Sequence, residues 1–274
     1  MLKDMTLGQF FPGNSVIHKL DARIKLIAAI VYIVTIFLAN NEWCYLALVL
    51  SSLALILFSR LSLRVILKGL KPILFVLTFT ALINIFVTKG EHLLLEKYFI
   101  HIYAEGIVRA VKMALRVTVL VIGTSVLLTY TTSPIVLTDA IESLLSPLKY
   151  ICVPVHDLAM IMTIALRFIP TLVEETEKIM NAQKARGADF DSGGLIKRAR
   201  ALVPVLIPLF VSSFSRADEL AVAMECRCYR GDVGRTRFVR MHLRPSDIFI
   251  LLLFGAFCAA IVLGNSFLPY HLPM

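Results

Sequence analysis

Long apolar runs dominate the pattern of hydrophobic and polar positions in this chain. Residues 25–40, 43–59, 72–88 and 247–264 are each almost free of charged side chains. Lipid offers no hydrogen-bond partner to free backbone groups, so an apolar run of about 20 residues is expected to cross a bilayer as a helix. The four runs therefore predict four membrane-spanning helices.

A fifth apolar run, residues 106–130, is long enough to span a membrane but carries Arg109, Lys112 and Arg116. Their spacing places the three side chains on one face of a helix, so the rest of its surface can still meet lipid. Two explanations fit them: the side chains reach the interface from the start of the helix, or they line a substrate pathway. Five spanning helices are predicted in total.

The basic residues between the runs predict the orientation. Residues 60–71 hold four lysines and arginines, and so does the segment up to the first run, whereas the loops on the other side hold only Lys89 and Lys97. Loops rich in lysine and arginine stay in the cytoplasm. We expect an N-terminal transmembrane domain (residues 1–130, four spans, N-terminus inside), a cytoplasmic region (131–246), and a last helix with an outside tail (247–274).

Composition agrees with a membrane protein. Hydrophobic residues make up 58% of the chain and charged residues 17%, and the mean hydropathy is +0.81. A net charge of +9 could suggest nucleic acid, but the basic residues flank apolar runs instead of alternating with aromatic ones, so we expect no nucleic-acid partner. The chain has five cysteines, an odd number, and most lie in or beside apolar runs, so we expect no disulfide framework.

The region 131–246 is unusually apolar for a cytoplasmic segment, and we expect about three helices in it. Thr132-Ser133-Pro134 predicts the start of an amphipathic helix that ends near Pro147. The second helix is expected from about 156 to 186 with a kink at Pro170, and the third from about 205 to 229 with an interruption at Pro208. Both long helices are apolar at their starts and charged at their ends.

A short phrase occurs near the end of each of these two helices. Residues 182–187 read Ala-Gln-Lys-Ala-Arg-Gly and residues 223–228 read Ala-Met-Glu-Cys-Arg-Cys, and each follows an Ile-Pro-x-(Leu/Phe)-Val step. One explanation is local, because arginine complements the negative end of a helix and glycine stops it. The repeat favours a second: each phrase is a narrow tip that enters a groove on another protein and offers a guanidinium group to carboxylates.

Three segments together resemble the transmembrane T component of energy-coupling factor transporters. They are the N-terminal stretch from Pro12 to Leu26, which includes Ile17-His18-x-Leu20-Asp21-x-Arg23-x-Lys25, and residues 158–190 and 217–236. The resemblance implies a subunit of a prokaryotic plasma-membrane importer for vitamins or metals, whose two coupling helices dock on two ATP-binding-cassette ATPases. It also implies a separate substrate-binding membrane S component as partner, and it places ATP and Mg in the ATPases, with no cofactor in this chain.

Residue roles follow from the same resemblance. The ATPase-docking residues would be Ala185, Arg186, Gly187, Cys226, Arg227 and Cys228. The surface toward the S component would include Met160, Met162, Ala165, Ala221 and Met224. Movement of the docked tips would reach the S component as shear across the apolar bodies of the two helices, without chemistry in this chain.

The second tip departs from the Ala-Arg-Gly pattern, because cysteine flanks Arg227 on both sides. Cysteine is small and apolar, so the tip should still fit a narrow groove. Without glycine at position 228, however, we expect the helix to run on to Tyr229 and to stop at Gly231. At Ala22 the family usually has proline, which weakens the N-terminal resemblance slightly.

Other classes of protein stay open as alternatives. Cys226 and Cys228 could share a metal ion, but a site would need two more ligands. Glu174, Glu175 and Glu177 could serve a membrane enzyme acting on lipid phosphates, although beside Lys178 they fit a solvated helix face better. An ATP-independent, proton-coupled carrier would need a carboxylate inside the membrane, and the predicted spans have none in their interior.

Overall fold

The computed structural model describes residues 10–88, 93–97, 100–151, 153–190, 194–231 and 243–267. The elements in chain order are α1 (Val16–Lys19), α2 (Ala22–Leu38), α3 (Glu42–Ser59), α4 (Leu63–Val87), β1 (Leu93–Lys97), β2 (Ile100–Tyr103), α5 (Ala104–Thr124), α6 (Pro134–Leu145), α7 (Val155–Ala185), α8 (Leu195–Cys226) and α9 (Pro245–Phe267). A π-helical turn, Ser125–Thr129, continues α5, and a 3-10 turn, Ser146–Ile151, follows α6. The all-α class is confirmed, with one short antiparallel hairpin of β1 and β2 that the sequence did not predict.

The chain divides into two compact units. Among the described residues, the membrane unit comprises those from 10 to 140 and from 243 to 267, and the crossed-helix unit those from 141 to 231. The predicted domain boundaries at residues 131 and 246 stay a prediction. Which side of the membrane each part occupies stays a prediction.

Six helices in the described part of the chain are long and apolar enough to cross a membrane: α3, α4, α5 with its π-helical turn, α7, α8 and α9. Four of them, α3, α4, α5 and α9, correspond to predicted spans. The first predicted span corresponds to α2, which has 17 residues. By length and composition α7 and α8 could also span, so their predicted place in the cytoplasm depends on their charged residues.

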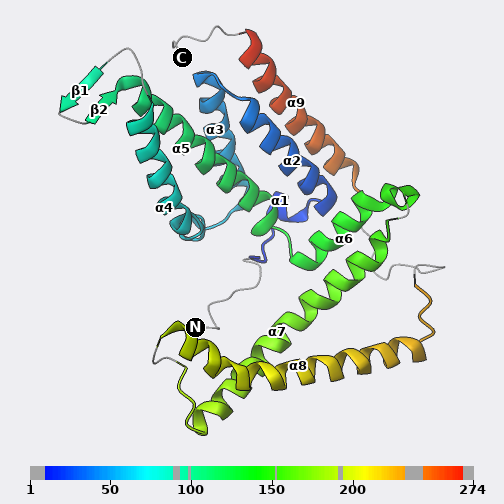
Figure 1. Ribbon diagram of the computed structural model, residues 1–274. Helices are drawn as coiled ribbons and strands as arrows, with labels where there is room; N and C mark the ends of the chain where they lie inside the picture. The colour runs from blue at the N-terminus through cyan, green and yellow to red at the C-terminus, as the bar shows by residue number, and fades with distance from the viewer. Residues whose placement is uncertain are drawn as a thin grey trace. The chain divides into compact units, whose positions relative to one another are not determined.

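The core of the membrane unit lies where α2, α3, α5 and α9 run side by side (Figure 1). Tyr32 and Ile36 of α2 are completely buried there, and the Tyr32 hydroxyl lies 3.0 Å from Ser51 Oγ. Gly123 of α5 packs on the Tyr32 ring so closely that an added Cβ would lie 2.1 Å from Cε1. Only glycine at this position lets α5 approach α2 to this distance.

Polar groups join the helices where α2 ends. Arg116 of α5 donates from Nη2 to the carbonyl of Ala39 at 2.7 Å and to the hydroxyl of Tyr45 at 2.6 Å. Lys112, one turn earlier, lies 3.5 Å from Glu42 at the start of α3. These basic side chains therefore lie level with the connection between α2 and α3, which favours the interface explanation over a substrate pathway.

The opposite end of the membrane unit gives the N-terminal motif a structural role. Lys25 is 2% exposed, and its ammonium group donates to the Thr131 carbonyl at 2.9 Å and to Thr132 Oγ1 at 3.1 Å. His18 Nε2–H donates to the Phe11 carbonyl at 2.9 Å, which assigns the proton to that nitrogen in the neutral ring. The motif thus holds the segment that leads from α5 into α6.

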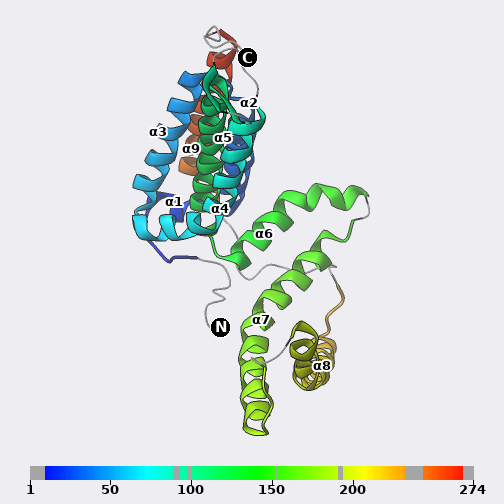
Figure 2. The ribbon, with the colours of Figure 1, turned by 60° about the vertical axis from the view of Figure 1, so that its left-hand side comes forward.

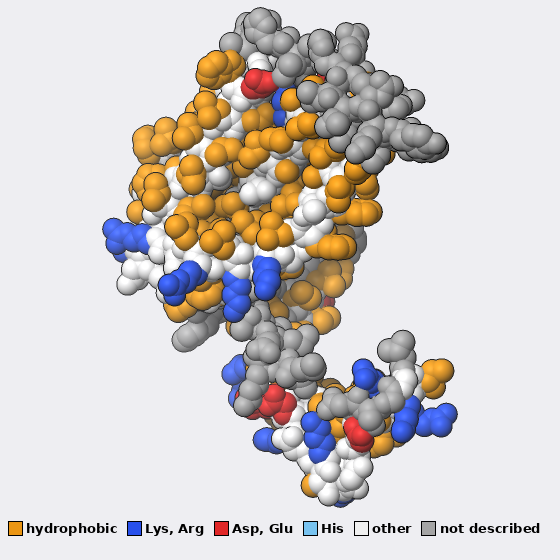
Figure 3. All heavy atoms as spheres, turned by 90° about the vertical axis from the view of Figure 1, so that its left-hand side faces the viewer, with side chains coloured by type: hydrophobic (Ala, Val, Ile, Leu, Met, Phe, Trp, Pro, Cys, Tyr) orange, Lys and Arg blue, Asp and Glu red, His pale blue; other side chains and the backbone are white. Residues whose placement is uncertain are grey.

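Most of the membrane unit's surface is apolar. Figure 3 shows hydrophobic side chains across one face, with lysine and arginine side chains along an edge. Of the α4 residues, all of which the structure describes, Ile66 alone is buried. Exposed basic residues lie between α3 and α4 and in the first turns of α4: Arg60, Arg64, Lys68 and Lys71. An apolar surface bordered by cations is typical of a protein embedded in lipid.

Candidate functional site

The two long helices of the crossed-helix unit, α7 and α8, contact and cross each other (Figures 1 and 2). Both are continuous through their prolines, Pro170 in α7 and Pro204 and Pro208 in α8. The predicted start of α8 near residue 205 and its interruption at Pro208 are therefore wrong, since the helix begins ten residues earlier, at Leu195.

A contact between the two helices compensates for one of these prolines. Pro208 has no N–H, so it leaves the carbonyl of Pro204 without its partner inside the helix. The side-chain amide of Gln183, near the end of α7, donates to that carbonyl over 3.4 Å. This long hydrogen bond gives the Pro204 carbonyl a partner and connects the end of α7 to the body of α8.

The α7 tip ends in a Schellman motif. Arg186 is the C-cap residue, and Gly187 follows with φ of +87°. The N–H of Gly187 donates to the Lys184 carbonyl and the N–H of Ala188 to the Gln183 carbonyl, each at 3.0 Å. This pair of hydrogen bonds defines the motif and requires a left-handed residue directly after the cap.

The α8 tip has the same geometry. Arg227 is the C-cap residue, and Cys228 follows with φ of +56°. The N–H of Cys228 donates to the Glu225 carbonyl at 2.9 Å, and that of Tyr229 to the Met224 carbonyl at 3.0 Å. The sequence repeat is therefore also a repeat of backbone structure.

The expectation that α8 runs on to Tyr229 is wrong. The helix ends at Cys226, and Cys228 itself takes the left-handed conformation that glycine would adopt more easily. A side chain there costs about 1–2 kcal/mol relative to glycine. The two backbone hydrogen bonds of the cap offset this cost, so the tip keeps its shape without glycine.

The predicted docking residues are at the surface at both tips. Ala185, Arg186 and Gly187 are exposed on α7, and Cys226, Arg227 and Cys228 on α8. Within the described part of the chain neither guanidinium group has a hydrogen-bond or ion-pair partner. Each arginine can therefore offer its full set of donors to carboxylates on another molecule. The C-terminal ends of α7 and α8 lie well apart (Figure 1).

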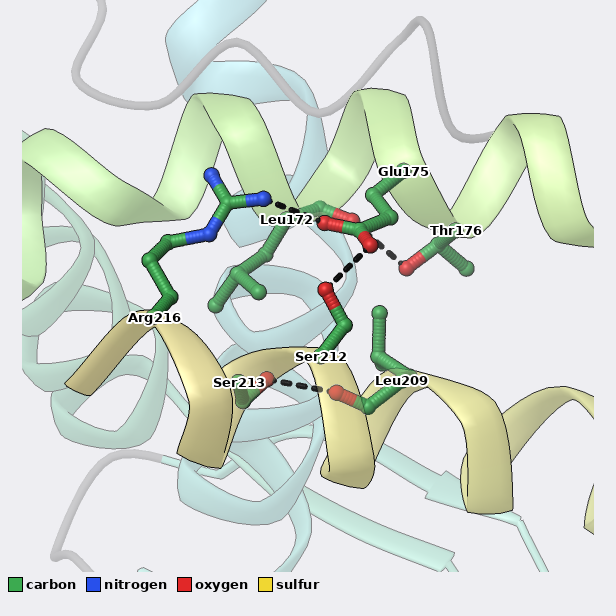
Figure 4. A network of polar contacts seen from close by, with 7 residues as sticks. All are labelled: Leu172, Glu175, Thr176, Leu209, Ser212, Ser213 and Arg216. Atoms are coloured by element: carbon green, nitrogen blue, oxygen red, sulfur yellow. Dashed lines mark hydrogen bonds and ion pairs between the residues drawn. The ribbon is translucent and has the colours of Figure 1, made fainter. Parts of the chain in front are cut away.

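A polar contact that the sequence pattern did not predict lies at the crossing of α7 and α8. One oxygen of Glu175 on α7 accepts a short hydrogen bond from Ser212 Oγ on α8, and the other lies 2.7 Å from Arg216 Nη2 (Figure 4). The prediction that Glu174, Glu175 and Glu177 form a solvated face is therefore wrong for Glu175. The sequence signal for this contact is Ser212 four residues before Arg216, because this spacing places both side chains on one face of α8.

The predicted S-component residues lie away from this contact, toward the start of α7 and the end of α8. Met162, Ala165 and Ala221 are exposed, and Met160 and Met224 are half-buried. Their role toward a partner stays a prediction. In the described part of the chain no three His, Cys, Asp or Glu side chains gather as a metal site would require.

These features define a class: a multi-pass, α-helical membrane protein with a crossed pair of helices that ends in two exposed arginine tips. A family model described as CbiQ, cobalt transport protein, matches residues 13–238. The energy-coupling factor transporter transmembrane protein EcfT of Ruminiclostridium cellulolyticum is 54% identical over 250 residues, which cover 91% of this chain and 93% of that protein.

Proteins of the same name from other bacteria extend the match. The one from Clostridium kluyveri is 53% identical over 269 residues, 98% of this chain and 97% of the relative. The one from Bacillus subtilis is 45% identical over 251 residues, 92% of this chain and 94% of the relative. The chain belongs to the family of energy-coupling factor transporter transmembrane proteins, the T components. It is a transporter component and a multi-pass protein of the plasma membrane, and the predicted resemblance is confirmed.

Proposed function

We propose that this chain is the coupling subunit of an ATP-driven importer for a vitamin or another micronutrient. It links two ATP-binding-cassette ATPases to a separate substrate-binding membrane S component. The observation that carries the proposal is the repeated tip: two long helices end in the same Schellman motif, and each exposes one arginine at the cap position.

The chemistry of the tips suits docking in a groove. Their flanking residues are small, namely Ala185 and Gly187 at one tip and Cys226 and Cys228 at the other, so each end of helix is narrow. Arginine forms two parallel hydrogen bonds with a carboxylate, which fixes orientation as well as position. ATP and Mg would be bound by the ATPases, and this chain would act without catalysing a reaction.

The bodies of α7 and α8 supply an apolar surface for the S component. Exposed apolar side chains occur on α7 at Leu158, Ile161 and Met162 and on α8 along residues 202–214. Large exposed apolar areas mark sites of contact with protein or lipid. Apolar packing is non-directional, so such a surface tolerates the sliding that transport would require.

A binding assay tests the docking role. Replacing Arg186 and Arg227 together by alanine is expected to abolish co-purification of the ATPases in detergent, while the protein still inserts in the membrane. A matched control replaces Lys197 and Arg200, two exposed cations near the start of α8. This control removes the same charge and is expected to retain the ATPases. Undiminished co-purification with the double arginine variant contradicts the proposal.

Single replacements give a second readout. Two tips on one scaffold raise each other's effective concentration, so one replacement should weaken the association without abolishing it. ATP-dependent uptake by the reconstituted complex should fall in parallel with ATPase binding. Uptake that needs no co-purifying ATPase would instead indicate an ATP-independent carrier.

A further inference from the structure

The contact between α7 and α8 is centred on a single carboxylate. Ser212 and Arg216 lie four residues apart, so they project from one face of α8, and both bind Glu175. The Glu175 and Arg216 side chains are 24% and 32% exposed, so water only partly screens their attraction.

Neighbouring hydroxyl groups do not share this role. Thr176 Oγ1 donates to the Leu172 carbonyl and Ser213 Oγ to the Leu209 carbonyl, each at 2.7 Å, so both turn back into their own helices (Figure 4). At the crossing drawn there, Glu175 is the side chain that links α7 to α8. The second link, from Gln183 to the Pro204 carbonyl, lies eight residues further along α7 and eight residues earlier in α8.

Together the two links fix the angle between α7 and α8 as well as the place where the helices cross. A rise of 1.5 Å per residue puts them about 12 Å apart along each helix. A single contact would let the helices rotate about it, whereas two contacts separated along both axes hold the angle between them. Apolar packing alone would not hold this angle, because it has no preferred direction.

The angle matters because the tips are at the ends of lever arms. From Glu175 to Arg186 the arm is about 16 Å, and from Ser212 to Arg227 it is about 22 Å, at 1.5 Å per residue. A rotation of about 10° at the crossing moves such tips by about 3–4 Å, which is enough to break an arginine–carboxylate contact.

We infer that Glu175 is a positioning residue that sets the angle between α7 and α8 and thereby the spacing of the two docking tips. The inference rests on the proposed docking function. With the link intact, a displacement of one tip moves the other helix as well. Without the Glu175 link, each tip can stay docked, but movement of one tip no longer moves the other helix. ATP hydrolysis then continues without transport.

Spin-label distances in the full chain in lipid nanodiscs measure this spacing directly. One label goes on the native Cys226 and one on an introduced cysteine at the exposed Ala182, with the other cysteines replaced. Glu175→Gln keeps the shape of the side chain and removes its charge, and we expect the distance distribution to broaden by about 3 Å or more, as the lever arms require. Glu174→Gln is the matched control, because Glu174 is an exposed neighbour on the same helix, and it is expected to leave the distribution unchanged.

Transport by the complete complex gives the functional readout. Glu175→Gln is expected to lower ATP-driven uptake about fivefold, the scale of one partly exposed ion pair, while the ATPases still co-purify and hydrolyse ATP. Reversing the pair, with Glu175→Arg and Arg216→Glu together, should narrow the distance distribution again. Arg216→Gln, which removes the other charge of the pair, serves as a second variant should Glu175→Gln fail to fold, and the same broadening is expected.

Two outcomes overturn the inference: an unchanged distance distribution in Glu175→Gln, or equal broadening in Glu174→Gln. Failure of the docking proposal is distinguishable, because it appears as retained ATPases in the double arginine variant. The spin-label experiment contains no ATPase, so its result does not depend on docking.

Discussion

The cap positions of the two tips make a paired prediction about backbone strain. Gly187 and Cys228 occupy the same place after their arginines, with φ of +87° and +56°. An L side chain is disfavoured in this region by about 1–2 kcal/mol, whereas glycine is not. Gly187→Ala should therefore destabilise the first tip, and Cys228→Gly should stabilise the second.

The magnitude at Gly187 comes from the backbone alone. A Cβ added there meets no atom within 4 Å, so no steric clash adds to the cost. A free energy of about 1–2 kcal/mol corresponds to roughly a 5- to 30-fold change in the population of the capped conformation. At Cys228 the same reasoning gives a change of similar size and opposite sign.

Hydrogen exchange reports this population at single amides. The diagnostic groups are the N–H of Ala188 and the N–H of Tyr229, which close the two Schellman motifs. We expect protection at Ala188 to fall in Gly187→Ala and protection at Tyr229 to rise in Cys228→Gly. Docking of the ATPases should weaken in Gly187→Ala, because the arginine would no longer be held at a formed cap. Equal protection in wild type and both variants would refute the claim that a side chain at this position disfavours the cap.

Two further predictions concern accessibility and packing. The tip cysteines, Cys226 and Cys228, should react with a maleimide in the free chain and be protected once the ATPases bind, whereas the buried Cys44 and Cys258 should stay unreactive in both states. Labelling followed by peptide mass analysis checks this. Equal labelling of the tip cysteines with and without bound ATPases contradicts docking. Gly123→Ala should lower the free energy of unfolding by about 1–3 kcal/mol, because the added methyl overlaps the buried Tyr32 ring. Gly255→Ala, with open space around it, is the control and should be neutral or stabilising in the same thermal unfolding assay, so equal losses would exclude the packing explanation.

Features with a local cause could be predicted from the sequence. Apolar runs gave α3, α4, α5 and α9, because a membrane imposes length and composition on each helix separately. The repeated phrase predicted two matching tips for the same reason, since a helix cap forms within six consecutive residues. Even at Cys228, where residue preference argued against it, the hydrogen bonds of the cap decided the backbone conformation.

Features that depend on distant partners could not be predicted. Glu175 looks like part of a solvated acidic face until Arg216, 41 positions later, is placed beside it. Lys25 looks like a flanking cation of a membrane span, yet its partners Thr131 and Thr132 lie more than 100 positions away. In each case the residue type fits two environments equally well, and only the packing of helices selects one.

The two tips are alike at the cap and unlike just before it, and this difference has a consequence for coupling. The phrase in α7 has Gln183 where the phrase in α8 has Met224. Gln183 ties the first tip to the body of α8, through the carbonyl that Pro208 leaves free. Met224 has no amide group to make an equivalent bond, and the second tip lies about 16 Å beyond Arg216 along α8, at 1.5 Å per residue. The Gln183 link is therefore a feature of the first tip that the second tip cannot copy, and the two arginines should not be expected to contribute equally to docking.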